Sequence, residues 1–129
     1  TTTRASMAFY DPDNNSITVD LFYFKNEKGH DLVRTVNHEL GHAFTDQVCE
    51  RLESDFFHRK PSPQKSKISE GIAEYFAHSI DDYPSEHYFA GSVYCLFGPS
   101  CDLYCGGYKE VKPVLEKLGV EKGIESLVK

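Results

Sequence analysis

Residues 36–44 read VNHELGHAF and contain the pattern H-E-x-x-H. On an α-helix each residue turns by about 100°, so His38 and His42 lie one turn apart on the same face. Two imidazoles placed in this way can share one Zn²⁺ ion. Glu39 lies beside that pair, where it can take a proton from a water and later pass it to a leaving amine. This stretch therefore predicts a helix that carries two metal ligands and a general base.

The alternative is an amphipathic helix whose histidines are merely solvated, and it predicts no bound metal. Gly41 costs about 1 kcal/mol in helix propensity relative to Ala, but it leaves room on a helix that must pack closely. The apolar spacing predicts a helix from about Asp31, its N-cap, to about Arg51. The two histidines then lie at its middle, where a rigid backbone positions them best.

A second charged pattern follows at residues 69–77, which read SEGIAEYFA. A catalytic zinc site uses three protein ligands and keeps one position open. Glu70 and Glu74 are four residues apart and share a helical face. One carboxylate can bind the metal while the other accepts a hydrogen bond from a ligating histidine. The alternative is a solvated pair of like charges, although such a pair mildly destabilises a helix.

The sequence H-E-L-G-H followed by E-G-I-A-E-Y resembles the gluzincin metallopeptidases, in which a Glu on a second helix is the third zinc ligand. The resemblance implies that Glu70 joins His38 and His42 around one zinc ion, and that Glu74 supports His38. The specific match covers about residues 36–77, and the loop between the two motifs is longer than in many members of the family.

The closing residues, GYKEVKPVL and LGVEKGIESL, and the short length resemble the minigluzincins, which are single-domain gluzincins. The resemblance implies zinc-dependent peptide-bond hydrolysis, with Glu39 as general base and then acid. Gluzincins often use a Tyr or His from the C-terminal half to stabilise the oxyanion. Tyr108 is the preferred candidate because it begins the closing pattern, and the others are Tyr88, Tyr94 and His87.

Aminopeptidase relatives carry a G-x-M-E-N-type motif that holds the substrate's α-amine, and this sequence lacks it. We therefore expect an endopeptidase or oligopeptidase that acts on peptides or proteins. The polar N-terminal segment or the C-terminal helix is expected to block the cleft, which would give a latent zymogen. The competing function is a non-catalytic zinc-binding or inhibitory module, against which the intact Glu39 argues. An unrelated helical interaction protein is a third alternative and predicts no metal.

The 129 residues predict one catalytic domain, with an N-terminal part over about 1–58 and a helical C-terminal subdomain over about 68–129. The formal net charge of −6 argues against a nucleic-acid partner. No apolar run approaches the roughly 18 residues that a membrane span needs. Residues 1–6 carry no apolar targeting core, so we expect a cytoplasmic protein; a removed leader stays open because the chain begins without Met.

Two strands, over residues 5–10 and 16–24, are predicted to form a hairpin around the turn DPDNN at 11–15. In gluzincins a sheet edge pairs with the substrate backbone, and the resemblance implies this role for one of these strands. The fold class is therefore α+β, with a small twisted hairpin packed on the long active-site helix, a central cleft and a helical C-terminal half. Its helices are expected over residues 68–79, 84–96, 108–118 with a bend at Pro113, and 121–128 after a Gly119 cap.

Residues 56–67 are predicted to form a loop because they combine two prolines with a basic cluster. Two interpretations of the basic cluster stay open. Its cations form a solvated face, or one of them, Arg59 or Lys60, contacts acidic groups of the substrate. The four cysteines are Cys49, Cys95, Cys101 and Cys105, and they form no C-x-x-C pair, so a structural zinc ribbon is not expected. The last three are close enough in sequence to allow a disulfide, although reduced thiols are the default in the cytosol.

Overall fold

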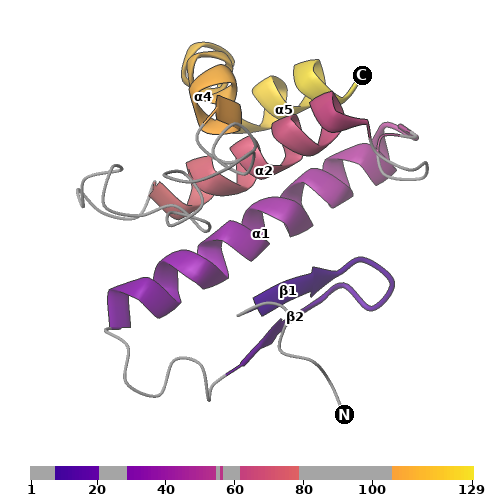
Figure 1. The fold of residues 1–129 in the computed structure, drawn as a ribbon. Helices are drawn as coiled ribbons and strands as arrows, with labels where there is room; N and C mark the ends of the chain where they lie inside the picture. The colour runs from indigo at the N-terminus through magenta and orange to yellow at the C-terminus, as the bar shows by residue number, and fades with distance from the viewer. Residues whose placement is uncertain (1–7, 21–28, 55, 57–61, 79–105) are drawn as a thin grey trace.

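Helix α1 (Gly29–Arg51) runs through the middle of the molecule, with a β-hairpin on one side and three further helices on the other (Figure 1). The computed structural model describes residues 8–20, 29–54, 56, 62–78 and 106–129. The other elements are β1 (Ala8–Asp11), β2 (Ser16–Val19), α2 (Pro63–His78), α4 (Gly107–Leu118) and α5 (Val120–Val128). The predicted α+β fold class is confirmed.

The hairpin pairs β1 and β2 in an antiparallel register that places Ala8 opposite Val19. Its turn is held by the carboxylate of Asp11, which accepts hydrogen bonds from the Asp13 N–H at 3.0 Å and the Asn14 side-chain amide at 2.7 Å. Asn15 adopts a φ of 48°, a left-handed conformation that Asn tolerates better than most residues. The predicted turn is therefore confirmed, while the outer parts of both predicted strands, 5–7 and 21–24, lie outside the described residues.

Two helix starts differ from the sequence expectation. Helix α1 begins at Gly29, before Asp31, so Asp31 lies inside the first turn and is not the N-cap. Helix α2 begins at Pro63 and not near residue 68. The reason is local: Ser62 Oγ accepts a hydrogen bond from the Lys65 N–H at 3.2 Å, which is the contact of an N-cap with the third helical residue. The proline predicted to mark a loop instead occupies the first helical position, where its missing N–H costs nothing.

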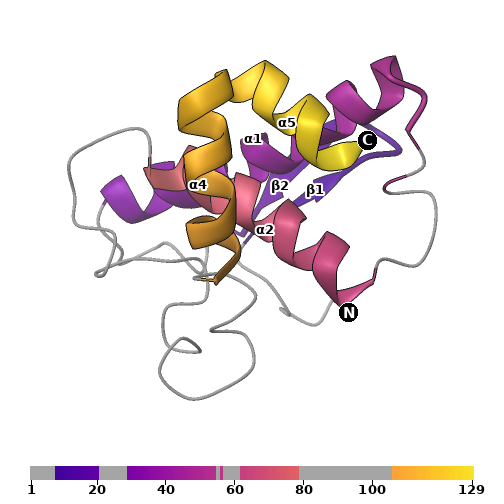
Figure 2. The ribbon, with the colours of Figure 1, turned by 90° about the horizontal axis from the view of Figure 1, so that it is seen from above.

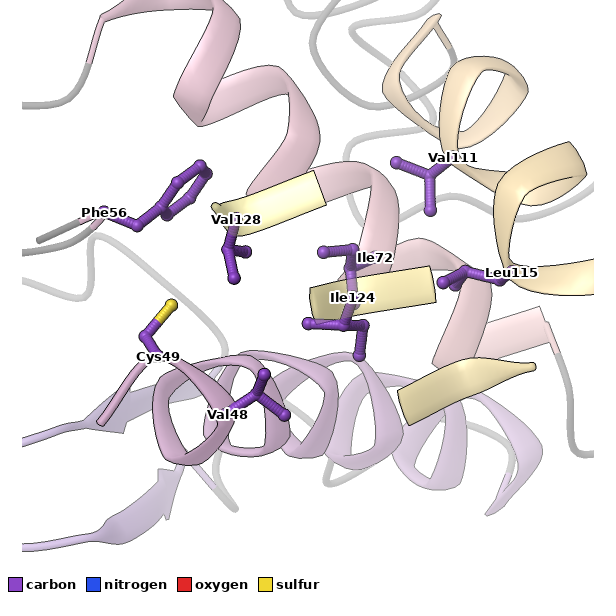
Figure 3. Packing of buried hydrophobic residues seen from close by; sticks show 8 residues of the cluster. All are labelled: Val48, Cys49, Phe56, Ile72, Val111, Leu115, Ile124 and Val128. Carbon is purple, nitrogen blue, oxygen red and sulfur yellow. The ribbon is translucent and has the colours of Figure 1, made fainter. Parts of the chain in front are cut away.

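The hydrophobic core lies on the side of α1 away from the hairpin. Figure 3 shows its buried side chains gathered between α1, α2, α4 and α5; they are Val48, Cys49, Phe56, Ile72, Val111, Leu115, Ile124 and Val128. Complete burial of a large aliphatic side chain contributes about 1.5–3 kcal/mol, so this cluster fixes how the helices stack. The Cys49 thiol is free and buried, and burial raises its pKa.

Helix α4 crosses α2, and α5 packs against α4 and α1, as the view from above shows (Figure 2). Helix α4 continues through Pro113 and ends at Gly119, which has a φ of 88° and donates its N–H to the Leu115 carbonyl at 2.9 Å. This confirms the predicted glycine cap. Among the parts of the chain that the structure describes, no helix is long and apolar enough to cross a membrane.

Several expectations fall on residues outside the described ranges. They are the helix over 84–96, the cations Arg59 and Lys60, the alternative oxyanion donors His87, Tyr88 and Tyr94, and the disulfide among Cys95, Cys101 and Cys105.

Candidate metal centre

Helices α1 and α2 lie close together at Gly41. A β-carbon added there would lie 2.7 Å from the α-carbon of Ala73 and 3.2 Å from Cγ of Phe76. Real β-carbons do not come this close to a backbone, so only glycine permits the crossing. The crossing turns the face of α1 that carries His38 and His42 toward the face of α2 that carries Glu70 and Glu74.

One carboxylate oxygen lies between the two imidazoles. Glu70 Oε1 is 3.0 Å from Nε2 of His38 and 3.2 Å from Nε2 of His42. Four ligands at about 2.0–2.1 Å around a tetrahedral ion lie roughly 3.3 Å from one another. The two distances from Glu70 Oε1 to the imidazole nitrogens are thus close to the edge length of such a tetrahedron.

Glu39 lies next to this group. Its Oε2 is 3.9 Å from His38 Nε2, farther than the Glu70 oxygen. The donor atoms of His38, Glu39 and His42 lie within 4.8 Å of one another, a grouping that could hold a metal ion. The Glu70 oxygen is closer to His38 Nε2 than the Glu39 oxygen is, and the assignment of Glu70 as the third ligand stays a prediction.

Each histidine has a second partner that orients its ring. His38 Nδ1 lies 2.9 Å from Oε1 of Glu74, whose side chain is fully buried. His42 Nδ1 lies 3.2 Å from the hydroxyl of Ser69. Groups that bind the far nitrogen of a metal-ligating histidine fix its tautomer and raise its basicity. The support from Glu74 was predicted; that from Ser69 was missed, although Ser69 directly precedes Glu70 on the same helix.

Burial and charge shift the proton affinities of the group. Burial lowers the pKa of His38, but the hydrogen bonds and negative charges of Glu70 and Glu74 outweigh burial and raise that pKa to about 10. Burial raises the pKa of Glu70, but its hydrogen bonds to His38 and His42 outweigh burial and lower that pKa well below its usual range. The carboxylates therefore favour a positive charge between them, which a proton or a metal cation can supply.

Glu39 behaves differently from Glu70. Burial raises the pKa of its carboxyl, and the nearby histidines and a hydrogen bond from the backbone N–H of Tyr10 only partly oppose this. A carboxyl with a raised pKa can exchange a proton nearer to neutral pH than an exposed one. The hydrogen bond from Tyr10, a residue of β1, also places this strand in direct contact with Glu39.

Tyr108, the preferred oxyanion donor from the sequence, lies at the start of α4 with its ring against His78. Their ring centroids are 4.9 Å apart. His78 Nε2 is in turn 3.4 Å from Oε2 of Glu74, on the side of that carboxylate away from His38. Tyr108 thus contacts the group that supports the site, and its predicted role in stabilising the oxyanion stays a prediction.

A pocket of about 360 Å³ opens beside Glu39 and His42, between the hairpin and α1. The described residues that line it are Phe9, Tyr10, Pro12, Glu39, His42 and Asp46. None of these comes from the C-terminal helix, because α5 packs against α4 and against the C-terminal part of α1. The N-terminal segment, the other expected source of latency, lies outside the described residues up to position 7.

Comparison of the chain with protein-family models, with curated proteins and with solved structures found no match in any of the three.

Proposed function

We propose that this protein hydrolyses peptide bonds with the help of one zinc ion held by His38, His42 and Glu70. The observation that carries the proposal is the position of Glu70 Oε1, at 3.0 and 3.2 Å from the facing nitrogens of the two rings. Two imidazoles and one carboxylate form a ligand set that suits zinc and leaves a fourth position for water or substrate. The resemblance of the two motifs to gluzincins gives the same ligands.

When bound, zinc would supply Lewis acidity, polarising a carbonyl and lowering the pKa of a water. Glu39 would take the proton of that water and later donate it to the leaving amine. Ser69 and Glu74 would act by orienting His42 and His38.

The substrate backbone is proposed to lie along β1. This strand pairs with β2, and the backbone N–H of Tyr10 donates a hydrogen bond to the Glu39 carboxylate. A peptide added to a strand edge gains main-chain hydrogen bonds that depend little on its sequence. This fits an endopeptidase or oligopeptidase better than an enzyme that must hold a free α-amine.

The test compares zinc content with hydrolysis in three proteins. Wild-type protein should bind one zinc per chain, measured by elemental analysis, and cleave a generic quenched peptide library. Glu39→Gln should retain the zinc and lose cleavage, whereas Glu70→Gln should lose both. Glu116→Gln is the matched control, because it makes the same change at an exposed position on α4.

Each alternative function gives a different result. A non-catalytic zinc-binding or inhibitory module would hold zinc and cleave nothing, even after removal of the N-terminal segment. An unrelated helical interaction protein would contain no zinc, even after the purified protein had been dialysed against a zinc solution.

A further inference from the structure

The pocket beside Glu39 combines an apolar wall with a single carboxylate outside the metal group. Phe9, Tyr10 and Pro12 of the hairpin form one side, and Asp46 projects from α1 one turn beyond His42. A group entering it would therefore lie directly next to the proposed zinc ligand and base. A volume of about 360 Å³ is ample for one amino-acid side chain.

Asp46 is held in place at this pocket. Its Oδ2 accepts a hydrogen bond of 2.9 Å from the hydroxyl of Tyr10, whose oxygen also lies 3.2 Å from Oδ1 of Asn15. A hydroxyl has one proton, and the shorter contact with a charged acceptor is the stronger one. The bond ties the hairpin to α1 and keeps the carboxylate and the aromatic ring side by side.

The surroundings of the pocket are negative. Burial, the hydrogen bond to Asp46, and the charges of Asp46, Glu50 and Asp11 raise the pKa of Tyr10 to about 12. Among the described residues that line the pocket, none is a lysine or an arginine. At the Asp46 end of the pocket, no lysine or arginine among the described lining residues offsets the negative charge, so this end favours a positive charge.

We propose that this pocket binds the lysine or arginine side chain of a peptide substrate next to the scissile bond. The aliphatic stem of such a side chain would pack on Phe9 and Pro12, and its cationic head would meet Asp46 and the face of Tyr10. An apolar side chain of the same size would cover Asp46 without replacing its lost water contacts, which is unfavourable. The inference rests on the proposed peptide hydrolysis and specifies its substrate class.

The first test uses quenched peptides that carry lysine, norleucine or glutamate at each of three positions on either side of the cleaved bond. At one position we expect kcat/KM to be roughly tenfold higher for lysine than for norleucine, and lowest for glutamate. Asp46→Asn can still accept the Tyr10 hydroxyl but loses the charge, and it should bring the lysine-to-norleucine ratio close to one. Glu116→Gln should keep the wild-type ratio.

Equal rates for lysine and norleucine in wild-type protein would overturn the inference and leave the proposed hydrolysis standing. A lysine preference that persists in Asp46→Asn would also overturn it, because the preference would then arise elsewhere. The preference should weaken as salt is added, since the pocket is open to solvent.

A second measurement separates the two proposals if no peptide is cleaved. Nα-acetyl-lysine methylamide and Nα-acetyl-norleucine methylamide are titrated into the metal-loaded protein, and the amide signals of β1 are followed by NMR. Stronger binding of the lysine compound to wild type than to Asp46→Asn supports a cation pocket, even where hydrolysis has failed. Equal binding of the two compounds overturns it.

Discussion

The α-carbon of Ala73 on α2 lies 2.7 Å from the position that a β-carbon on Gly41 of α1 would occupy. Gly41→Ala would therefore push the two helices apart, and we expect a loss of about 1–3 kcal/mol in the free energy of unfolding. Helix propensity alone predicts the opposite sign, a gain of about 1 kcal/mol. Urea unfolding of the metal-free proteins measures which effect is larger.

The same displacement would carry Glu70 away from the two histidines, so Gly41→Ala should also weaken zinc binding in a chelator competition. Leu40→Ala is the matched control, because the neighbouring Leu40 side chain is 44% exposed and its loss should change stability by about 0.5 kcal/mol or less. If Gly41→Ala bound zinc as tightly as wild type, the α1–α2 separation would not set the geometry of the site.

Glu74→Gln should weaken zinc binding by about 10–100-fold while keeping the size of the side chain. The fully buried Glu74 carboxylate contacts His38 on one oxygen and lies near His78 on the other. An amide cannot offer negative charge to Nδ1 of His38, so that ring becomes a weaker ligand. Isothermal titration of metal-free protein with zinc measures the change.

Ser69→Ala removes the corresponding partner of His42, and we expect a smaller loss because a neutral hydroxyl at 3.2 Å is a weaker partner than a carboxylate at 2.9 Å. For Glu74→Gln, the variant Glu116→Gln serves as the control for removing one negative charge. Unchanged zinc affinity in Glu74→Gln would mean that the fold alone, and not the contact between Glu74 and His38, orients His38.

Local patterns predict part of the candidate site. The i, i+4 spacing of His38 and His42, and of Glu70 and Glu74, fixes which side chains share a face of each helix. The resemblance to gluzincins supplied the further condition that the two faces meet, while Gly41 indicated only that the first helix packs closely. The hairpin turn and the Gly119 cap were also predictable, because each depends on residues within a few positions.

Contacts between distant segments were not predictable in the same way. No sequence periodicity predicts that Tyr10 contacts Glu39 or Asp46. Both contacts depend on how the hairpin packs against α1. The sequence prediction places the start of α2 too late for a different reason: Ser62 and Pro63 match an N-cap followed by a first-turn proline, but prolines beside a basic cluster also indicate a loop. Ser69 was overlooked because a single serine on a helix carries little signal.

Tyr108→Phe distinguishes two roles for one side chain. Stabilisation of the oxyanion requires the hydroxyl, and its loss would lower kcat by about 10²-fold. Packing against His78 requires only the ring, which phenylalanine keeps. Because the pocket beside Glu39 is lined by other described residues, we expect kcat to change by less than about threefold. A hundredfold fall at unchanged zinc content would instead support the role predicted from sequence.

Raising the pH above 6.5 should destabilise the metal-free protein and widen the stability gap between it and the zinc-loaded protein. In the metal-free protein the pKa of His38 is raised from 6.5 to about 10, so the folded state binds more protons than the unfolded chain within that window. The stabilising contribution of His38 is therefore complete below pH 6.5 and is lost as pH rises through about 10. Glu39, whose pKa is also raised, contributes in the same direction, and the lowered pKa of Glu70 matters only at acid pH.

A bound cation replaces the proton that His38 holds, so raising the pH strengthens metal binding and adds stability. Thermal melts with excess chelator should therefore show Tm falling above pH 6.5, while the gap between zinc-loaded and metal-free Tm widens. His38→Gln should flatten the metal-free slope, because the titrating ring is gone. If the metal-free Tm rose over this window, the carboxylates would not be holding a proton on His38, and the charge balance that makes the site attractive to a cation would be wrong.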